Sequence, residues 1–354
     1  MKVMQIMPEF GLAGAEIMCE NLMYELVELG IEVVAISLYD FHSPITERLE
    51  SNGIKVLYLN KKPGLDFSII RKLKKVFKVE KPDVIHTHRY VMQYSIPAAI
   101  FSKIKHRVHT IHNIAKKENT KIARILNKLF YKFAHVVPVA LSEEIKKTVI
   151  KEYHLKEKNV PVILNGINLQ KYSQKKDYNL HNPIKIIHVG RFSEQKNHIG
   201  LVWAFYNLHK EIPNTTLELV GDGEKKESIS SLVEQLGLKD SVHFLGLNSN
   251  VGALLFDSDI FVLPSLYEGI PMTIIEAMAT GLPIIATNVG GLSDMITSYE
   301  NGILISAPED LKNACLTLIN NKELRERIGM NAFVSSNAFS SKTMALKYSE
   351  IYGK

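Results

Sequence analysis

Two glutamates eight residues apart, Glu268 and Glu276, are the first candidates for chemistry in this sequence. Glu268 lies in the loop LYEGIP, and Glu276 lies in an apolar run typical of a helix that begins at Pro271 and ends near Gly281. A carboxylate among Met, Ile and Ala is costly to bury without a partner. Glu276 could accept hydrogen bonds from a cis-diol such as that of ribose, and Glu268 from the hydroxyls of a second sugar. A helix cap and a half-buried glutamate are the structural alternative.

A basic loop, GRFSEQKN, spans residues 190–197 directly after the strand-like run IKIIHV. Arg191 offers a planar pair of donors and Lys196 a compact positive charge, which together suit a diphosphate. A solvated basic loop is the alternative, and both interpretations stay open on this motif alone. The start of the helix after LYEGIP adds free backbone N–H groups, which also favour an anion.

Three glycine-bearing turns are weaker signals. GDGEKK (221–226) follows a strand, and Gly221 and Gly223 would allow close backbone approach to a ligand. HFLG (243–246) offers backbone groups that could read the flat edge of a base. GLAGAE (11–16) is neither a full dinucleotide fingerprint nor a triphosphate-binding loop, but it places small residues where a phosphate or sugar could approach.

Metal chemistry is not favoured by the sequence. Four histidines lie at two strand ends, and no carboxylate or cysteine accompanies them: His86, His88, His109 and His112. Of these, His112 is best placed to face a cleft. The D-x-D of residues 257–259 opens a buried-looking strand and is taken as structural. The cations of the 190–197 loop already neutralise phosphate charge, so we expect no metal and no cofactor.

These motifs sit on alternating strand-like and helix-like runs along the whole chain. The strands are too apolar for a half-exposed sheet, as parallel sheets require. The polar stretch QKKDYNLHNP (174–183) interrupts the alternation and is the expected linker. We therefore predict an α/β protein with two doubly wound, Rossmann-like domains and ligands at the carboxyl ends of the strands.

Charge is distributed unevenly over the 354 residues. Residues 1–180 carry 29 Lys and Arg against 18 Asp and Glu, a net +11, whereas residues 181–354 have a net charge of −5. The first half therefore favours an anionic partner. Two isolated cysteines and an N-terminal apolar stretch too short for a secretory signal lead us to expect a cytoplasmic location.

Two basic amphipathic segments, 61–81 and 121–133, indicate an anionic membrane surface as that partner. The expectation is that their apolar faces pack inward on the sheet while the basic faces and a few protruding residues meet lipid. The protein would then be peripheral on the inner membrane face.

The motifs GLAGAE, VHTIHN, NGIN, GRFSEQKN, GDGE, HFLG and SLYEGIPMTIIEAMATGLPIIAT occur in one order over nearly the whole chain. This series resembles the retaining GT-B glycosyltransferases of the E-x₇-E type, in family 4. The resemblance implies an acceptor-binding domain over 1–175, a donor-binding domain over 180–337, and a C-terminal helix over 341–354 that packs back on the first domain.

The resemblance also implies roles for residues. His112, Arg191, Lys196 and Glu268 would be catalytic. The donor would be bound by Gly14, Gly190, Arg191, Lys196, Gly221, Gly223, Leu245, Glu268, Gly269, Ile270, Pro271 and Glu276. The sequence departs mildly from the family pattern at Ala13-Gly14, His112-Asn113, Asn168 and Asp294.

The resulting expectation is a transferase that moves a hexose or N-acetylhexosamine from a nucleotide sugar, UDP-linked by preference, to a glycan or polyprenyl-linked acceptor in cell-surface polysaccharide synthesis. A sugar-nucleotide 2-epimerase on the same fold is the first alternative. A nucleic-acid-binding protein, prompted by the basic half, is the second, but the chain has no base-reading motif and we expect no nucleic-acid partner.

Overall fold

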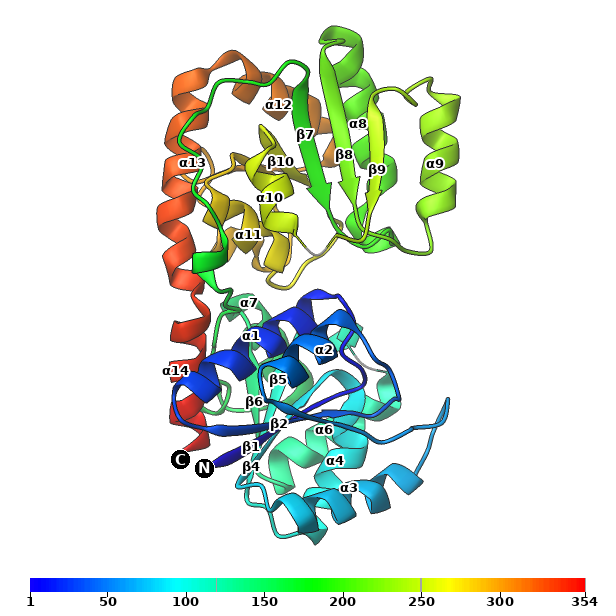
Figure 1. Ribbon diagram of the computed structural model, residues 1–354, viewed down its shortest axis with the longest axis vertical. Helices are drawn as coiled ribbons and strands as arrows, with labels where there is room; N and C mark the ends of the chain where they lie inside the picture. The colour runs from blue at the N-terminus through cyan, green and yellow to red at the C-terminus, as the bar shows by residue number, and fades with distance from the viewer. Residues whose placement is uncertain (119, 249, 354) are drawn as a thin grey trace. The chain divides into compact units, whose positions relative to one another are not determined.

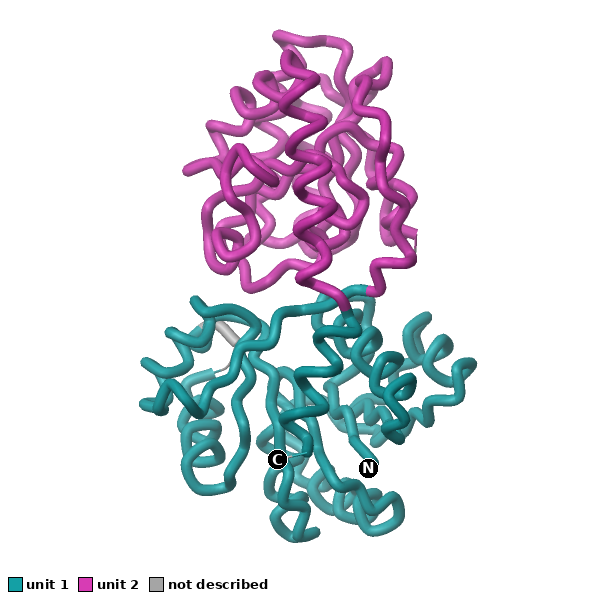
Figure 2. The backbone as a smooth tube through the Cα atoms, turned by 90° about the vertical axis from the view of Figure 1, so that its left-hand side faces the viewer, with its two compact units in different colours: residues 1–167, 341–354 teal, residues 168–340 magenta. Residues whose placement is uncertain are grey.

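A computed structural model describes residues 1–118, 120–248 and 250–353. The chain forms two compact units (Figure 2). The first unit comprises residues 1–167 and 341–354, and the second comprises residues 168–340. None of the described helices is both long and apolar enough to cross a membrane.

The first unit is a six-stranded parallel sheet in the order β3-β2-β1-β4-β5-β6, flanked by helices (Figure 1). Its strands are β1 (Lys2–Met7), β2 (Glu32–Ser37), β3 (Lys55–Tyr58), β4 (Val84–His88), β5 (His106–Ile111) and β6 (Val136–Ala140). Its helices are α1 (Gly14–Glu28), α2 (Pro44–Ser51), α3 (Ser68–Glu80), α4 (Met92–Phe101), α5 (Ala115–Glu118), α6 (Lys121–Phe133), α7 (Glu143–Tyr153) and α14 (Ser341–Tyr352).

The second unit repeats the design with the order β12-β11-β10-β7-β8-β9. Its strands are β7 (Ile184–Val189), β8 (Thr215–Val220), β9 (Val242–Gly246), β10 (Ile260–Leu263), β11 (Ile284–Thr287) and β12 (Ile303–Ile305). Its helices are α8 (His198–Glu211), α9 (Lys226–Gln235), α10 (Val251–Phe256), α11 (Met272–Thr280), α12 (Leu311–Asn320) and α13 (Lys322–Ser336). The predicted fold class, two doubly wound parallel sheets, is confirmed.

Burial explains why these runs form parallel strands. Every residue of β4, β10 and β11 is buried, and β1 and β2 are buried beyond their first residue. Strands covered on both faces need apolar residues at consecutive positions, which is the pattern that the sequence shows. The helices begin at polar caps where the chain provides them, as at Ser43, whose capping box starts α2.

Helix α14 belongs to the first unit although 173 residues separate it from residue 167. It lies beside α1 (Figure 1), where the Ser341 hydroxyl donates to Glu25 at 2.6 Å. The Ser341 amide donates to the Ile167 carbonyl at 2.9 Å. On its inner side Tyr348 and Tyr352 are fully buried, so the helix completes the hydrophobic core of this unit.

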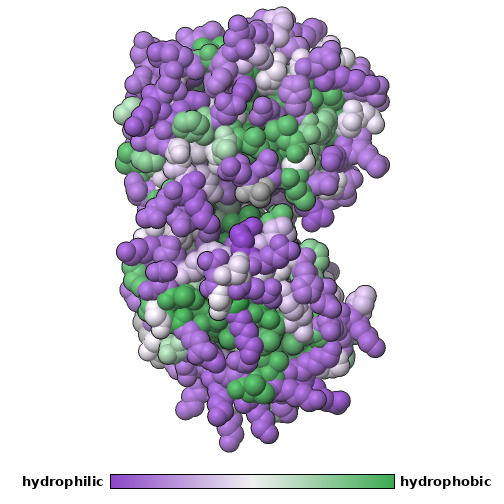
Figure 3. Space-filling view, in the orientation of Figure 1, coloured by the Kyte–Doolittle hydropathy of each residue, from purple (hydrophilic) through white to green (hydrophobic). Residues whose placement is uncertain are grey.

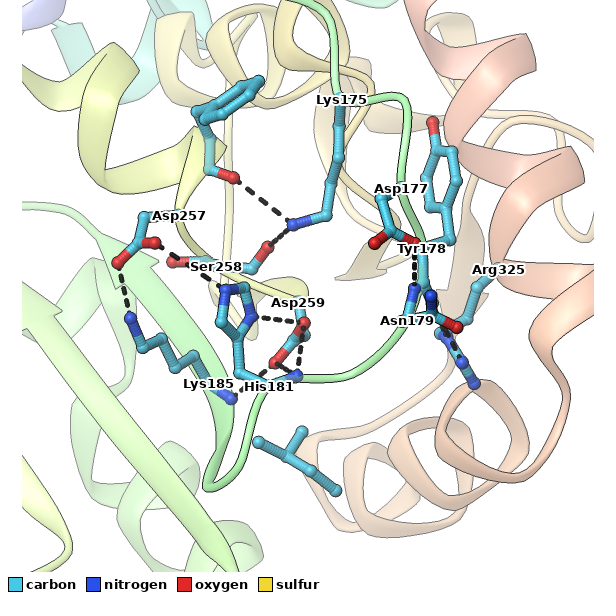
Figure 4. A network of polar contacts seen from close by, with 12 residues as sticks. Lys175, Asp177, Tyr178, Asn179, His181, Lys185, Asp257, Ser258, Asp259 and Arg325 are labelled. Atoms are coloured by element: carbon cyan, nitrogen blue, oxygen red, sulfur yellow. Dashed lines mark hydrogen bonds and ion pairs between the residues drawn. The ribbon is translucent and has the colours of Figure 1, made fainter.

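The expected linker is bound firmly to the second unit (Figure 4). Lys175 donates to the carbonyl of Ser258 at 2.6 Å, and the carbonyl of Tyr178 accepts from the Arg325 guanidinium at 3.0 and 3.2 Å. Buried Asp259 accepts from the His181 backbone and ring and from the Lys185 amide. The D-x-D aspartate therefore has a structural partner in this segment.

Helix α6 corrects one expectation. We expected its apolar face to pack inward, but Ile122 and Phe133 are about three-quarters exposed, and Ile125 and Leu129 are exposed as well. The helix instead buries Asn127 and Tyr131. In α3 the expectation holds, since Ile69, Leu73 and Phe77 are buried.

Candidate active site

The candidate site of the second unit lies where its chain path reverses. β7 and β10 are neighbours in the sheet, but the chain continues from β7 towards β8 and from β10 towards β11. The loops after these two strands therefore diverge at the carboxyl ends of the strands, which is where doubly wound sheets commonly bind ligands. The first loop carries residues 190–196 and the second carries residues 264–271, which hold most of the predicted site residues.

An ion pair joins the two loops. Lys196, in the short 3-10 helix η4 (Glu194–Lys196), places Nζ 2.6 Å from Oε1 of Glu268. The side chains are only 15% and 5% exposed. The other carboxylate oxygen accepts from Gln195 Nε2 at 3.2 Å, and Gln195 also donates to the Tyr267 carbonyl at 2.9 Å. The sequence assigned Lys196 and Glu268 to different parts of a ligand and gave no sign of their direct contact or of Gln195.

The glycine turns after β7 and β8 pack against each other. A Cβ atom on Gly221 would lie 2.2 Å from the Gly190 carbonyl oxygen, and one on Gly223 would lie 2.6 Å from the Phe192 carbonyl oxygen. Both glycines have positive φ, at +136° and +157°. Gly190, Gly221 and Gly223 therefore form a continuous backbone surface beside the strand that carries Leu245.

Arg191 lies at the exposed edge of this surface. Its side chain is 72% exposed, and its Nη2 lies 3.1 Å from Oε2 of Glu224. Exposed pairs of this kind are weak because solvent screens them. A ligand with more negative charge could therefore take Arg191 from Glu224 at little cost.

Glu276 lies on α11, eight residues after Glu268 in the sequence, and is buried. Oε1 of Glu276 accepts from the hydroxyl of Tyr172 at 3.1 Å. Burial raises the pKa of Glu276 to about 7, only partly offset by that hydrogen bond. Tyr172 ends the motif NGINLQKY, for which the sequence suggested no role.

The N-terminus of α11 faces this region without a capping side chain. Gly269 and Ile270 lead into it, and Pro271 occupies the cap position. Its first amides therefore have no side-chain acceptor at the cap and can stabilise an anion. Seven of the predicted donor contacts lie in the two loops and this first turn, which the structure brings to one edge of the sheet.

Gly290 and Gly291, in the 3-10 helix η5 (Gly290–Asp294), support the loop of Glu268 from behind. A Cβ atom on Gly290, where φ is +59°, would lie 1.9 Å from the Glu268 carbonyl oxygen. One on Gly291 would lie 2.5 Å from the Gly269 carbonyl oxygen. We did not predict a role for these glycines, although a Gly-Gly pair soon after a buried strand indicates close backbone approach.

Within the described part of the chain, five buried polar atoms at this edge have no hydrogen-bond partner: His188 Nε2, both ring nitrogens of His198, Ser265 Oγ and Thr273 Oγ1. They come from the end of β7, the start of α8, the loop after β10 and the first turn of α11. An unpaired buried polar group is costly, so these atoms are further candidates for ligand contact.

In the first unit, His112 follows β5 and is held by its neighbours. Its Nε2 lies 3.0 Å from Nδ1 of His88. Burial lowers the pKa of His112 to about 3, so the ring is neutral at ordinary pH. Gly14 begins α1, which has no side-chain cap, and Glu16 in the same turn binds Arg89 at 2.5 Å. Arg89 was not among the residues that the sequence singled out.

The histidine pairs of the first unit are engaged with protein partners. His86 binds the hydroxyls of Tyr352 and Thr110, and His109 binds Thr87. Among residues 1–118, 120–248 and 250–353, no group of three His, Cys, Asp or Glu side chains is arranged to hold a metal ion.

Comparisons with known proteins identify the family and the fold of this chain. The family descriptions "Glycosyltransferase Family 4" and "Glycosyl transferases group 1" match residues 12–171 and 170–334. An uncharacterized glycosyltransferase of Haemophilus influenzae is 30% identical over 88% of each chain. A structure of Anabaena HepE in complex with UDP and glucose has a TM-score of 0.87 and 21% identity, and the match covers 99% of this chain and 98% of HepE.

A second relative, whose name states its reaction, is the Escherichia coli UDP-Gal:alpha-D-GlcNAc-diphosphoundecaprenol alpha-1,3-galactosyltransferase. It is 32% identical over 266 residues, which are 68% of this chain and 66% of the relative. The chain thus spans just under two thirds of that relative. The fold and the matches together define a glycosyltransferase of GT-B architecture. The chain belongs to glycosyltransferase family 4.

Proposed function

We propose that this protein transfers a hexose or N-acetylhexosamine from a UDP-linked sugar, with retention of anomeric configuration, to a glycan or lipid-linked acceptor. The observation that carries the proposal is the Lys196–Glu268 pair at the switch point of the second sheet, close in sequence to Glu276 and to the uncapped start of α11. A cation, amides and two carboxylates suit a diphosphate with a sugar on each side.

The Lys196–Glu268 ion pair suggests how the nucleotide sugar binds. An incoming diphosphate attracts Lys196 and Arg191, and Glu268 is then released to accept hydrogen bonds from the transferred sugar. Glu276 accepts from the ribose hydroxyls. As the nucleoside diphosphate departs, negative charge grows on its phosphate, and the preorganised cations and amides stabilise that charge.

Retention is proposed to follow a same-face path. The leaving phosphate takes up the acceptor's proton while the acceptor oxygen forms its bond to the anomeric carbon. This path needs no carboxylate nucleophile on the opposite face of the sugar, which leaves Glu268 free to position hydroxyl groups.

The comparisons support the donor and acceptor classes. The Escherichia coli relative is named for UDP-Gal and for a diphosphoundecaprenol acceptor, and HepE was solved with UDP and glucose. We infer the same classes here: a UDP-sugar donor, an acceptor on a polyprenyl carrier, and a place in cell-surface polysaccharide synthesis.

Arg191 and Lys196 form the proposed diphosphate clamp, which is tested by Arg191→Ala and Lys196→Ala in a transfer assay. Each loss of a donor to developing charge should lower kcat by roughly 10² to 10³. Lys210→Ala, an α8 lysine on neither loop, is the control and should retain full activity. Turnover within a few-fold of the parent for both variants would remove the clamp assignment.

The donor is identified by a thermal-shift panel of nucleotide sugars. A ligand at a hundred times its Kd stabilises by about 2.7 kcal/mol, which is readily measured. We expect UDP-sugars to give the largest shift. An absence of any shift with UDP- and GDP-sugars would contradict the proposal.

The 2-epimerase alternative is not favoured, because the relatives and neighbours named above are glycosyltransferases or bind UDP. Incubation with a sugar nucleotide and no acceptor separates the two activities. An epimerase converts the donor to its isomer, whereas the proposed transferase leaves it almost unchanged.

We further propose that the first unit docks on an anionic membrane, because α6 exposes an apolar stripe beside lysines. The stripe, at helical spacing, is Ile122, Ile125, Leu129 and Phe133. Lys121, Lys128 and Lys132 lie on the same helix, and Figure 3 shows apolar areas among hydrophilic side chains on this unit. Apolar side chains beside basic residues suit the boundary of an anionic bilayer.

Docking is tested by flotation with vesicles of phosphatidylglycerol and phosphatidylcholine. Burial of one large apolar side chain is worth about 1.5 kcal/mol or more, so Ile122→Ser with Phe133→Ser should lower binding more than tenfold. Val334→Ser, at an exposed position on α13, is the matched control. If the double variant floats like the parent, α6 is not the docking element.

A further inference from the structure

A buried chain of hydrogen bonds connects His112 to the C-terminal helix within the first unit. His112 Nε2 lies 3.0 Å from His88 Nδ1, and His88 Nε2 lies 2.9 Å from Gln5 Oε1. Gln5 Nε2 then donates to the hydroxyl of Tyr352 on α14 at 3.3 Å. Gln5 and His88 are fully buried, so bulk water does not supply alternative partners for them.

The series of hydrogen bonds continues beyond Tyr352. The Tyr352 hydroxyl lies 2.7 Å from His86 Nδ1, and His86 Nε2 lies 2.7 Å from Thr110 Oγ1. Thr110 in turn lies 2.6 Å from the hydroxyl of Tyr348. Two tyrosines of α14 are thus tied to two neighbouring strands, β4 and β5, at the edge from which His112 emerges.

The side-chain amide of Gln5 determines which atom donates in each hydrogen bond of this series. Its oxygen only accepts, so His88 must carry its proton on Nε2. Burial holds the pKa of His88 well below its usual value, and a neutral ring has one N–H, so His88 Nδ1 is an acceptor. His112 must therefore donate from Nε2. The thiol of Cys19, 3.9 Å from the same Gln5 oxygen, is a second donor consistent with this orientation.

The other side of Gln5 is consistent with the same direction. Its amide N–H donates to the Tyr352 oxygen, so the Tyr352 proton is directed to His86 Nδ1. His86 then carries its proton on Nε2 and donates to Thr110. Each hydrogen bond in the series then joins one donor to one acceptor, and no ring nitrogen in it needs a second proton.

We propose that His88 is a positioning residue and that Tyr352, through Gln5 and His88, holds His112 in the tautomer protonated on Nε2. His112 then presents only an acceptor at Nδ1, which suits a hydroxyl of the donor sugar rather than its ring oxygen. The role of His112 towards the sugar rests on the proposed function, whereas its tautomer does not. Helix α14 becomes part of the catalytic apparatus, beyond its packing on α1.

The tautomer is measured directly by nitrogen chemical shifts of ¹⁵N-histidine-labelled full-length protein. Signals are assigned with His112→Asn and His88→Asn. We expect both rings to be neutral, with the proton on Nε2. A proton on Nδ1 of His112, or a mixture of tautomers, would overturn the proposal without any assay of activity.

A matched pair of variants separates positioning from packing. Tyr352→Phe removes the hydroxyl that orients Gln5, whereas Tyr348→Phe removes the terminal hydroxyl, and both rings are buried on the same helix. Because a misplaced catalytic group can cost on the order of 10²-fold, Tyr352→Phe should lower kcat by roughly tenfold or more and populate the other His112 tautomer. Tyr348→Phe should leave the tautomer unchanged.

Equal effects of the two variants on kcat and on the His112 signals would show that the hydrogen bonds only hold α14 in place. That result would overturn the proposal. If the tautomer responds to Tyr352→Phe as expected but the parent transfers no sugar from any donor, the proposed function fails and the positioning of His112 stands.

Discussion

At the scale of single residues, Glu276 gives the site a dependence on pH. Its pKa in the folded protein is about 7, raised by burial. Folding therefore favours the protonated form: the stability that this group contributes is complete below its unfolded pKa and is lost as the pH rises through about 7. In the proposed donor complex, ribose hydroxyls donate to the charged form of Glu276, so nucleotide binding would favour loss of the Glu276 proton.

We predict that affinity for UDP-glucose rises by roughly tenfold between pH 6 and pH 8, because the proton on Glu276 must leave before the ribose binds. Titration calorimetry at the two pH values measures this difference. Glu276→Gln should bind with a flat profile. Glu218→Gln is the control, because burial raises the pKa of this β8 carboxyl as well. A flat profile in the parent would show that Glu276 does not meet the ribose.

The sequence located these chemical groups but not their contacts. Glu268, Lys196 and Glu276 stood out because charged residues followed apolar strands or lay inside an apolar helix. Gln195 and Tyr172 did not stand out, because their importance comes from hydrogen bonds to Glu268 and Glu276 across 73 and 104 residues of sequence. Spacing along the chain carries no information on such contacts.

At the scale of elements, the loop of Glu268 depends on the glycine turn behind it. Gly290→Ala should lower kcat/KM on the order of 10²-fold, because the new methyl group would displace the Glu268 backbone. Gly237→Ala is matched in backbone strain, with φ of +69° against +59°, but its methyl group would meet nothing within 4 Å. Similar losses in the two variants would refute this role.

Helices and strands were predicted well where one sequence pattern was present, and less well where a second feature of the sequence opposed it. The segment VPVILN reads as a strand, yet it forms only an isolated bridge between Val162 and Ala140. Pro161 has no N–H to donate, and the segment meets only the last residue of β6. Helix α6 has strong amphipathic periodicity, but periodicity gives the width of an apolar face and does not say whether protein or solvent covers it.

At the scale of the whole molecule, the segment around His181 joins the start of the second unit to its first strand, β7. Asp259→Ala would leave the backbone N–H groups of His181 and Lys185 without their acceptor. Each loss costs about 1–3 kcal/mol, so we expect a clear drop in the Tm of the second unit. Calorimetry of the full chain measures it. Asp257→Ala is the control, since its carboxylate is 65% exposed, and an equal drop there would contradict the assignment.

The first unit is assembled from two stretches of chain with the second unit inserted between them. During synthesis on the ribosome, residues 168–340 are a continuous stretch and can complete their core as soon as they emerge. The earlier-made residues 1–167 must wait for α14, leaving the places of Tyr348 and Tyr352 uncovered until residues 341–352 have been made. The unit whose synthesis begins first is therefore the unit whose core is completed last, and its unfinished core is the surface on which a chaperone would act.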